Sequence, residues 1–229
     1  MRKAERSRNG SRAASRAAED YLKAIFRLEE DGSAVSTSDL ADSLGRAAPS
    51  VTNMIKGLAA KGLVDHVPYH GVRLTREGRS AALRILRRHR VLESYLIEQL
   101  GYGWDGVHSE AERLEHAASD ELIDRMARAI GEPDEDPHGS PIPASDGHVD
   151  ARRAIPLAEA PRGETFIVGE VQDRVAGRLR EAGDAGLFPG VHVQVRGPGR
   201  DEGSLEVLVD GTPTTVTRSV AAAVSVREA

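Results

Sequence analysis

Four side chains of the types that bind metal ions recur within one short stretch of the chain. At 3.6 residues per turn, their spacing places all of them on one stripe of a helix. They are His108, Glu112, Glu115 and His116. Two imidazoles and two carboxylates that face the same way are typical of a metal site. The alternative is the polar outer face of a helix, on which Glu and Arg side chains form ordinary pairs.

A second pair of such residues precedes this stretch. His89 and Glu93 are spaced i and i+4 on a helix that apolar periodicity predicts over 79–100. Because the chain has no cysteine, disulfides, thiolate zinc sites and thiol catalysis are excluded, and any metal is held by nitrogen and oxygen atoms. Such ligands suit Mn²⁺ or Fe²⁺. A further carboxylate, Asp20, lies near the start of the first predicted helix.

The N-terminal part predicts a winged helix-turn-helix. Helices are predicted over 18–30, 36–45 and 49–61, and two short strands follow over 62–67 and 72–75. Two helices joined by a short turn that contains Gly are typical of a helix-turn-helix, and the strands directly behind them form the wing. We therefore expect this part to bind double-stranded DNA.

The third predicted helix carries the side chains that we expect to meet DNA. Its apolar residues face the core, so that small polar groups near its N-terminus are left for phosphate and base-edge contacts. Together with two residues at the start of the helix, the candidates are Ala47, Pro49, Ser50, Thr52, Asn53 and Lys56.

The charge distribution points to a polyanion partner at one end of the chain. Residues 1–90 carry +8, from 18 Lys and Arg against 10 Asp and Glu, and residues 91–229 carry −13, from 13 against 26. A solvated basic surface without a partner is the alternative. No apolar run approaches the ~20 residues needed to span a bilayer, and the first residues lack the apolar core of a secretory signal, so we expect a cytoplasmic protein without a membrane partner.

The whole chain predicts a multidomain α+β protein. Apolar residues left over near the end of the second helical part, including Tyr95, Leu96, Leu100 and Trp104, predict a homodimer seam. Short alternating runs beyond about residue 151, divided by Gly and Pro, predict a small β-barrel. The expected parts are a basic disordered tail over 1–17, a winged-helix DNA-binding domain over 18–80, a helical dimerisation and metal-binding domain over 81–145, a linker over 146–152 and a small β-barrel over 153–229.

Two finer expectations concern the helical part and the loop after it. A single helix is predicted over 107–130, which would carry both histidines of the first stretch. His138 and His148 lie in loop sequence rich in Pro, Asp and Gly, and we expect both to be exposed rather than to bind metal.

Several motifs together resemble the diphtheria-toxin-repressor family of metal-dependent transcriptional regulators, over essentially residues 18–229. They are Tyr21 to Glu30, Pro49-Ser-Val-Thr, Arg88-His-Arg-Val-Leu-Glu93, Val107-His108 with Glu115-His116 and Ser119-Asp120, and Gly139-Ser-Pro-Ile-Pro143. The resemblance implies a homodimer whose metal-loaded form binds a palindromic operator and represses metal-uptake genes.

The resemblance also implies two metal sites per subunit. It assigns His89, Glu93 and His108 to an ancillary site, and Asp20, Glu112, Glu115 and His116 to a primary, activating site. Iron-responsive members have Met and Cys at the positions of Asp20 and Glu112, whereas manganese-responsive members have Asp and Glu, as here. Carboxylate oxygens in place of sulfur favour Mn²⁺, so we expect a manganese-responsive repressor of manganese-uptake genes, with an iron-responsive one as the alternative.

The chain departs from the family pattern at two places. Short manganese regulators have a second acidic residue one turn after the aspartate, where this chain has Lys23. Three-domain members also draw ancillary ligands from the barrel, and those positions fall on Val175 and Arg178, or in a shifted alignment on Gln172 and Asp173.

Two other functional classes fit the sequence less well. A metalloenzyme is disfavoured because the stripe lacks HExxH spacing and no nucleophile or base stands near it. A metal-independent winged-helix regulator, whose barrel binds a small molecule or a protein, would leave the histidines and carboxylates as structural groups. Operator binding with and without Mn²⁺ separates the readings.

Overall fold

The computed structural model divides into two compact units, Met1–Leu83 and Arg84–Ala229. It describes residues 15–29, 33–67, 70–149, 154–172 and 176–229. Most of the predicted tail, and part of the predicted linker, lie outside these residues. The end of the tail is corrected, because the first helix already begins at Arg16.

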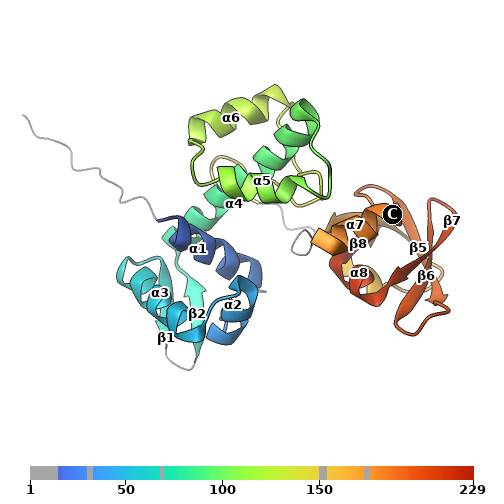
Figure 1. The fold of residues 1–229 in the computed structure, drawn as a ribbon, viewed down its shortest axis with the longest axis horizontal. Helices are drawn as coiled ribbons and strands as arrows, with labels where there is room; N and C mark the ends of the chain where they lie inside the picture. The colour runs from blue at the N-terminus through green and yellow to red at the C-terminus, as the bar shows by residue number, and fades with distance from the viewer. Residues whose placement is uncertain (1–14, 30–32, 68–69, 150–153, 173–175) are drawn as a thin grey trace, which may run out of the picture. The chain divides into compact units, whose positions relative to one another are not determined.

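The first unit is a three-helix domain followed by a two-stranded sheet (Figure 1). Its elements are α1 (Arg16–Leu28), α2 (Thr37–Leu44), α3 (Ala48–Ala60), β1 (Val64–Val67) and β2 (Gly71–Leu74). The two strands pair antiparallel, with Val64 opposite Leu74. The predicted helix-turn-helix and wing are therefore confirmed.

Local chemistry sets the bounds of α2. The Ser36 side chain accepts a hydrogen bond from the backbone of Asp39 at 3.0 Å, and the Asp39 carboxylate accepts from the Ser36 hydroxyl. At the other end Gly45 has φ of 59°, a left-handed conformation that Gly adopts without steric strain. Both the cap and the stop were predictable because they depend on neighbouring residues alone.

The apolar residues of the three helices and the sheet share one core. Leu22, Ile25, Leu40, Val51 and Ile55 are fully buried in it. A buried carboxylate fastens the end of α1 to this core: Glu29 accepts a hydrogen bond from the backbone of Leu74 at 3.2 Å and pairs with Arg79.

Three helices precede the C-terminal domain. The helix α4 (Arg76–Leu100) begins in the first unit and ends in the second, and α5 (Val107–Leu114) and α6 (Asp120–Ala129) follow. The predicted single helix over 107–130 is wrong. The Ser119 side chain caps a new helix by accepting from the backbone of Leu122 at 3.2 Å, so Glu115 and His116 lie on the turn after α5.

The C-terminal domain is one antiparallel sheet with two short helices (Figure 1). Its strands stand in the order β3-β8-β4-β5-β6-β7, which leaves β3 and β7 as edges among the described residues. The predicted small β-barrel is therefore corrected to an open sheet. Its strands are β3 (Ile155–Pro156), β4 (Thr165–Val171), β5 (His192–Pro198), β6 (Ser204–Val209), β7 (Thr212–Thr217) and β8 (Val224–Glu228). Its α-helices are α7 (Ala176–Asp184) and α8 (Arg218–Ala223), and η2 (Leu157–Glu159) is one turn of 3₁₀ helix.

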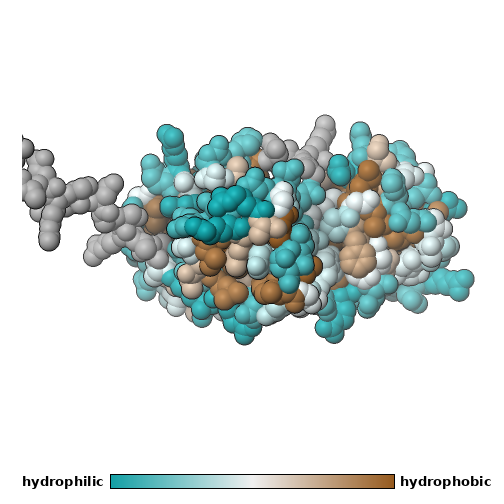
Figure 2. Space-filling view, turned by 90° about the horizontal axis from the view of Figure 1, so that it is seen from above, coloured by the Kyte–Doolittle hydropathy of each residue, from teal (hydrophilic) through white to brown (hydrophobic). Residues whose placement is uncertain are grey.

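The surface carries hydrophobic side chains in small groups separated by hydrophilic ones on the face that Figure 2 shows. Among the described residues, five large hydrophobic side chains are exposed: Leu100, Tyr102, Leu114, Leu122 and Phe188. No described helix is long and apolar enough to cross a membrane.

Candidate metal centre

The helix α4 supplies two of the predicted ligands. His89 and Glu93 stand one turn apart, and both are fully buried. The His89 Nε2 atom lies 3.1 Å from Oε1 of Glu93. Their i,i+4 spacing aims both side chains in one direction, as the sequence predicts.

The helix α5 and the turn after it bring the other predicted ligands to the same place. His108 Nδ1 lies 3.0 Å from Glu93 Oε1 and 3.0 Å from His89 Nε2. The Glu115 carboxylate, also fully buried, lies 2.5 Å from His89 Nδ1. One helix and the following turn therefore close over a buried face of α4.

The remaining two predicted ligands lie at the margin of this group. Glu112 Oε1 is 3.7 Å from His108 Nε2, and its side chain is about one third exposed. His116 Nε2 lies 3.4 Å from Glu115 Oε1, with 8% of the side chain exposed. The stripe that the sequence predicts is thus brought together in space, although it spans a helix and a turn.

The ligand atoms form overlapping sets rather than two separate ones. His89, Glu93 and His108 lie within metal-binding reach of one another, and so do His89, Glu112 and Glu115. The first set agrees with the predicted ancillary group. The 2.5 Å contact between His89 and Glu115 joins residues that the resemblance assigns to different ions. Asp20 lies on α1 in the first unit, and its predicted role stays a prediction.

A third set contains two residues that the sequence analysis missed. Asp136 and His138 are 6% and 1% exposed, and with Glu93 they lie within metal-binding reach of one another. The prediction that His138 is exposed is wrong, whereas His148 is exposed as predicted. The available signal was the Asp136-Pro-His138 spacing, which was obscured because Pro and Gly surround it. We call these residues together with His89, Glu93, His108, Glu112, Glu115 and His116 the histidine–carboxylate cluster.

Folding of the loop over residues 136–140 explains this burial. The Asp136 Oδ1 atom accepts hydrogen bonds from the backbone of His138 and of Ser140, both at 2.9 Å. The backbone of Val171 on β4 donates to the carbonyl of His138 at 2.8 Å. Arg90 on α4 donates to the carbonyl of Pro141 at 2.5 Å. The loop is closed on itself and held between α4 and the C-terminal sheet.

Burial and charge alter the acidity of this third set. Burial by itself raises the pKa of Glu93, but the charge of His89 and hydrogen bonds from the surrounding imidazoles outweigh it and hold the pKa well below the ordinary value. Burial, and after it the charge of Glu93, raises the pKa of Asp136 to about 7. Burial by itself lowers the pKa of His138, but the nearby Glu93 carboxylate outweighs it and raises the pKa.

Two buried atoms of the cluster show that it fits a cation. Glu93 Oε2 and His138 Nδ1 have no hydrogen-bond partner in the described structure and lie 3.9 Å apart. Buried polar atoms are nearly always satisfied, so an unpartnered oxygen beside an unpartnered nitrogen needs an explanation. The donors are carboxylate oxygens and imidazole nitrogens without sulfur, which suits a divalent cation of the Mn²⁺ or Fe²⁺ kind.

Two of the C-terminal positions considered as further ligands, Gln172 and Arg178, lie in the described part of the chain. Arg178 on α7 carries a guanidinium, which offers no lone pair to a cation. The backbone of Gln172 donates to the carbonyl of Ala223 at 2.9 Å. Val175 and Asp173 lie outside the described residues. Ligation from this domain stays a prediction.

The residues predicted to meet DNA share one face of α3. Val51, Ile55 and Leu58 are buried on its other face. Ala47 is the N-cap, Pro49 stands in the first turn, and the Thr52 hydroxyl donates to the carbonyl of Ala48 at 3.0 Å. All of the predicted contacts are exposed except the half-buried Thr52. We call this set the α3 face: Ala47, Pro49, Ser50, Thr52, Asn53 and Lys56.

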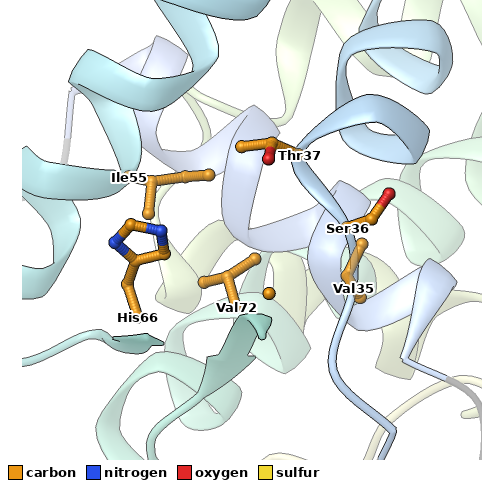
Figure 3. Close-up of a pocket in the computed structure, with 7 residues that line it drawn as sticks. Val35, Ser36, Thr37, Ile55, His66 and Val72 are labelled. Carbon is orange, nitrogen blue, oxygen red and sulfur yellow. The ribbon is translucent and has the colours of Figure 1, made fainter. Parts of the chain in front are cut away.

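A small hollow lies elsewhere in the first unit. Figure 3 shows His66 beside Ile55 on one side of it and Ser36 and Thr37 on the other. Its volume of about 90 Å³ is far below the roughly 300–1,000 Å³ of pockets that hold small molecules. We therefore assign no effector molecule to this hollow.

Comparison with known proteins agrees with this architecture part by part. Residues 14–72 match the family described as "Iron dependent repressor, N-terminal DNA binding domain", and residues 75–144 match its "metal binding and dimerisation domain". Residues 155–228 match the FeoA domain. The diphtheria toxin repressor of Corynebacterium efficiens is 33% identical over 159 residues, which are 67% of this chain and 69% of that protein.

The chain belongs to the diphtheria toxin repressor family. It is a metal-dependent transcriptional repressor of this family, whose members are repressors rather than enzymes. The iron-dependent repressor IdeR of Mycobacterium tuberculosis is 29% identical over 206 residues, covering 84% of this chain and 88% of that protein.

Solved structures of family members include manganese-dependent ones. A "Manganese-dependent transcriptional repressor complex with manganese" is 39% identical, with a TM-score of 0.84, and covers 93% of this chain and 100% of that chain. The relatives of this repressor are thus named for both iron and manganese. The choice between iron and manganese therefore depends on the ligand residues of this chain.

Proposed function

We propose that this repressor is activated by Mn²⁺, binds a palindromic operator as a homodimer and controls manganese-uptake genes in the cytoplasm. The observation that carries the proposal is the histidine–carboxylate cluster, which gathers nitrogen and oxygen donors from α4, α5 and the 136–140 loop without any sulfur. Hard donors of this kind favour Mn²⁺ over the softer transition metals.

Assignment of residues to two ions follows the family resemblance. The primary ion would be held by Asp20, Glu112, Glu115 and His116, and the ancillary one by His89, Glu93 and His108. The described structure supports a wider second group, because Asp136 and His138 share the buried carboxylate of Glu93. When bound, a divalent cation supplies positive charge that offsets these clustered carboxylates.

A bound cation can change the affinity for DNA only if it binds one state of the protein more tightly than another. Asp20 belongs to the first unit and the other proposed ligands to the second. A ligand set drawn from both units favours one arrangement of them, and a cation that binds this arrangement more tightly shifts the population towards it. Lys23, buried in α1 near Asp20, stands where short manganese regulators have an acidic residue, so their pair of manganese ions is not proposed here.

DNA contact is assigned to the α3 face. Its exposed Ser50 and Asn53 lie in the N-terminal half of α3, and Lys56 follows about one turn after Asn53; α3 is the second helix of the helix-turn-helix, which enters the major groove in this motif. Lys56 would contact phosphate, whereas Asn53 and Thr52 would contact base edges and thymine methyl groups.

Dimerisation is assigned to the helical part of the second unit. Of the four apolar residues predicted for the seam, Leu96 is buried within the chain and Trp104 packs against the C-terminal core, so these two are not available for it. Leu100 is 60% exposed, and Leu114 and Leu122 on α5 and α6 are also exposed. These leucines give the face on which we expect a second copy.

The test is metal-dependent DNA binding with a sequence found by selection. Random duplex DNA is selected on the full chain in Mn²⁺, and affinity for the recovered sequence is then measured with Mn²⁺ and with a chelator. We expect a palindromic sequence, two chains per duplex and a loss of affinity of at least tenfold in chelator. Binding that is unchanged by chelator contradicts metal activation.

Metal identity has its own experiment. The double variant Asp20→Met with Glu112→Cys should relax selectivity towards Fe²⁺, Co²⁺ or Ni²⁺, because it replaces two hard oxygen donors with soft sulfur. DNA binding is measured for each metal at equal free concentration. An unaltered order of metals would show that selectivity lies in other residues.

A metal-independent regulator remains the competing function, since one observation favours it. A groove of about 480 Å³ lies on the C-terminal sheet, lined by Ile155, Phe166, Val226 and neighbouring residues. Its volume is within the roughly 300–1,000 Å³ of small-molecule sites. The chelator experiment separates the two functions, because only the metal-activated one loses DNA affinity when Mn²⁺ is removed.

A further inference from the structure

Trp104 makes two hydrogen bonds to the loop that carries His138. Its indole Nε1 donates to the carbonyl of Pro137 at 2.8 Å, and its own carbonyl accepts from Nε2 of His138 at 2.9 Å. The centroids of the indole and imidazole rings are 4.9 Å apart. Trp104 therefore holds both the backbone and the ring of this histidine.

The second of these bonds selects the nitrogen that faces the cluster. A carbonyl oxygen only accepts, so Nε2 of His138 must carry the hydrogen. The Nδ1 atom is then the one left to bind a cation. It lies 3.9 Å from Oε2 of Glu93, and both atoms are buried without a hydrogen-bond partner.

The other side of the loop is fixed by close approach to the C-terminal sheet. Gly139 has φ of +86°, and a Cβ at this position would lie 1.9 Å from the carbonyl oxygen of Gly169. Gly169 lies at a register shift in β4, where the strand bulges. His138 is thus held between a strand backbone and Trp104.

Trp104 is itself held by the C-terminal domain. Its ring packs edge-on against Phe188, with centroids 5.0 Å apart. The indole also packs against Gly183 on α7, since its Cζ3 lies at an ordinary van der Waals distance, 3.5 Å, from where a Cβ would stand. These contacts support the indole in the orientation in which its N–H reaches Pro137.

We propose that Trp104 is a positioning residue that presents Nδ1 of His138 to the cation bound with Glu93 and Asp136. The proposal rests on the proposed function, because it requires that this part of the cluster binds Mn²⁺. Trp104 does not touch the ion. It fixes the orientation of the His138 ring, the ring nitrogen that faces the ion and the loop that carries the ring.

The variant Trp104→Phe removes only the indole N–H and part of the ring. We expect Mn²⁺ affinity at the His138 position to fall about tenfold, as for other outer partners of metal ligands. The probe is Mn²⁺ alone, titrated into the full chain and followed by electron paramagnetic resonance of the free ion. The matched control is Tyr102→Phe, an exposed aromatic in the same loop, which should bind Mn²⁺ as the unchanged chain does.

A spectroscopic readout separates positioning from general support of the fold. Trp104 is the only tryptophan of the chain, so intrinsic fluorescence reports on it alone. Emission should change during the Mn²⁺ titration, with the midpoint of ion binding, and this change should be lost in His138→Ala. Circular dichroism melts of each variant show whether it is folded at the titration temperature.

Three results decide the matter. Weaker Mn²⁺ binding in Trp104→Phe together with a His138-dependent change in emission supports the role of Trp104. Loss of one ion in His138→Ala, with Trp104→Phe unaffected or with silent emission, overturns it and leaves the proposed function standing. An unchanged ion count in His138→Ala overturns the cation position itself, and the role of Trp104 with it.

Discussion

The α3 face and the histidine–carboxylate cluster hold their side chains in opposite ways. The α3 face is a continuous part of one helix, and nearly all of its residues are exposed. The cluster draws residues from α4, α5, a turn and a loop, and its central residues Glu93, Glu115 and His138 are almost fully buried. Side chains that bind DNA must be accessible to it, whereas buried polar groups without other partners favour binding of a cation.

This difference has an energetic consequence. Several ionisable groups packed together out of water destabilise the metal-free fold unless they are paired or lose charge. The pairs of His89 with Glu93 and with Glu115 offset part of this cost. Exposed residues of the α3 face carry no such cost. The two regions should therefore respond differently to substitution, to pH and to metal.

The largest expected effect is the loss of the carboxylate that two ligand sets share. Glu93→Gln keeps the volume of the side chain but removes its charge, so Mn²⁺ binding should weaken by more than ~100-fold, because even outer partners of metal ligands cost about 10–100-fold. Calorimetric titration with Mn²⁺ measures this. The control is Glu98→Gln on the exposed part of the same helix. Equal Mn²⁺ affinities for Glu93→Gln and Glu98→Gln would contradict this prediction, because a buried carboxylate would then matter no more to the ion than an exposed one.

A second, smaller effect concerns pH in the metal-free chain. The pKa of Asp136 is raised from 3.8 to about 7, so the folded chain holds this proton more tightly than the unfolded chain does. Stability from this group is full below about pH 3.8 and is lost as the pH rises to about 7. The variant Asp136→Asn should lack this decline in melting temperature, whereas exposed Asp201→Asn should keep it. If melting temperature fell with pH in the same way for Asp136→Asn and for the unchanged chain, the proton on Asp136 would not be the cause of the decline.

A third effect, smaller again, is expected on the α3 face. Lys56→Ala should weaken binding to every DNA sequence by a similar factor and lower the slope of affinity against salt by about 1, because one phosphate contact is lost. Mn²⁺ binding should not change. Fluorescence anisotropy at several salt concentrations measures the slope, with Lys61→Ala at the C-cap of α3 as control. A loss confined to the selected operator would instead assign Lys56 to base reading.

The smallest effect is expected for charges that belong to neither region. Arg125 and Glu121 form an exposed i,i+4 pair on α6, with side chains 69% and 75% exposed. Arg125→Ala should change the free energy of unfolding by less than about 0.5 kcal/mol, and it should leave Mn²⁺ and DNA affinity unchanged. Chemical denaturation and the two binding measurements check this. A marked loss of DNA affinity would extend the functional surface to α6.

Sequence alone determined the parts of this protein that depend on neighbouring residues. The winged helix-turn-helix follows from apolar spacing, the Ser36 cap and Gly45, because capping and periodicity act within a few residues. The i,i+4 pairs at His89 and His108 and the missing cysteines named the class of ligand before any fold was known. The α3 face could also be predicted, since one helix carries all of it.

Only the tertiary structure decided how the cluster closes. Ser119 could have continued a helix or capped one, and capping places Glu115 and His116 on a turn. Asp136 and His138 lie in polar loop sequence and become buried because a strand bulge and Trp104 hold the loop over α4. The C-terminal sheet is open rather than closed, because the described strands β3 and β7 stand at its two edges. Contacts between distant residues decide these features, and periodicity along the chain does not record them.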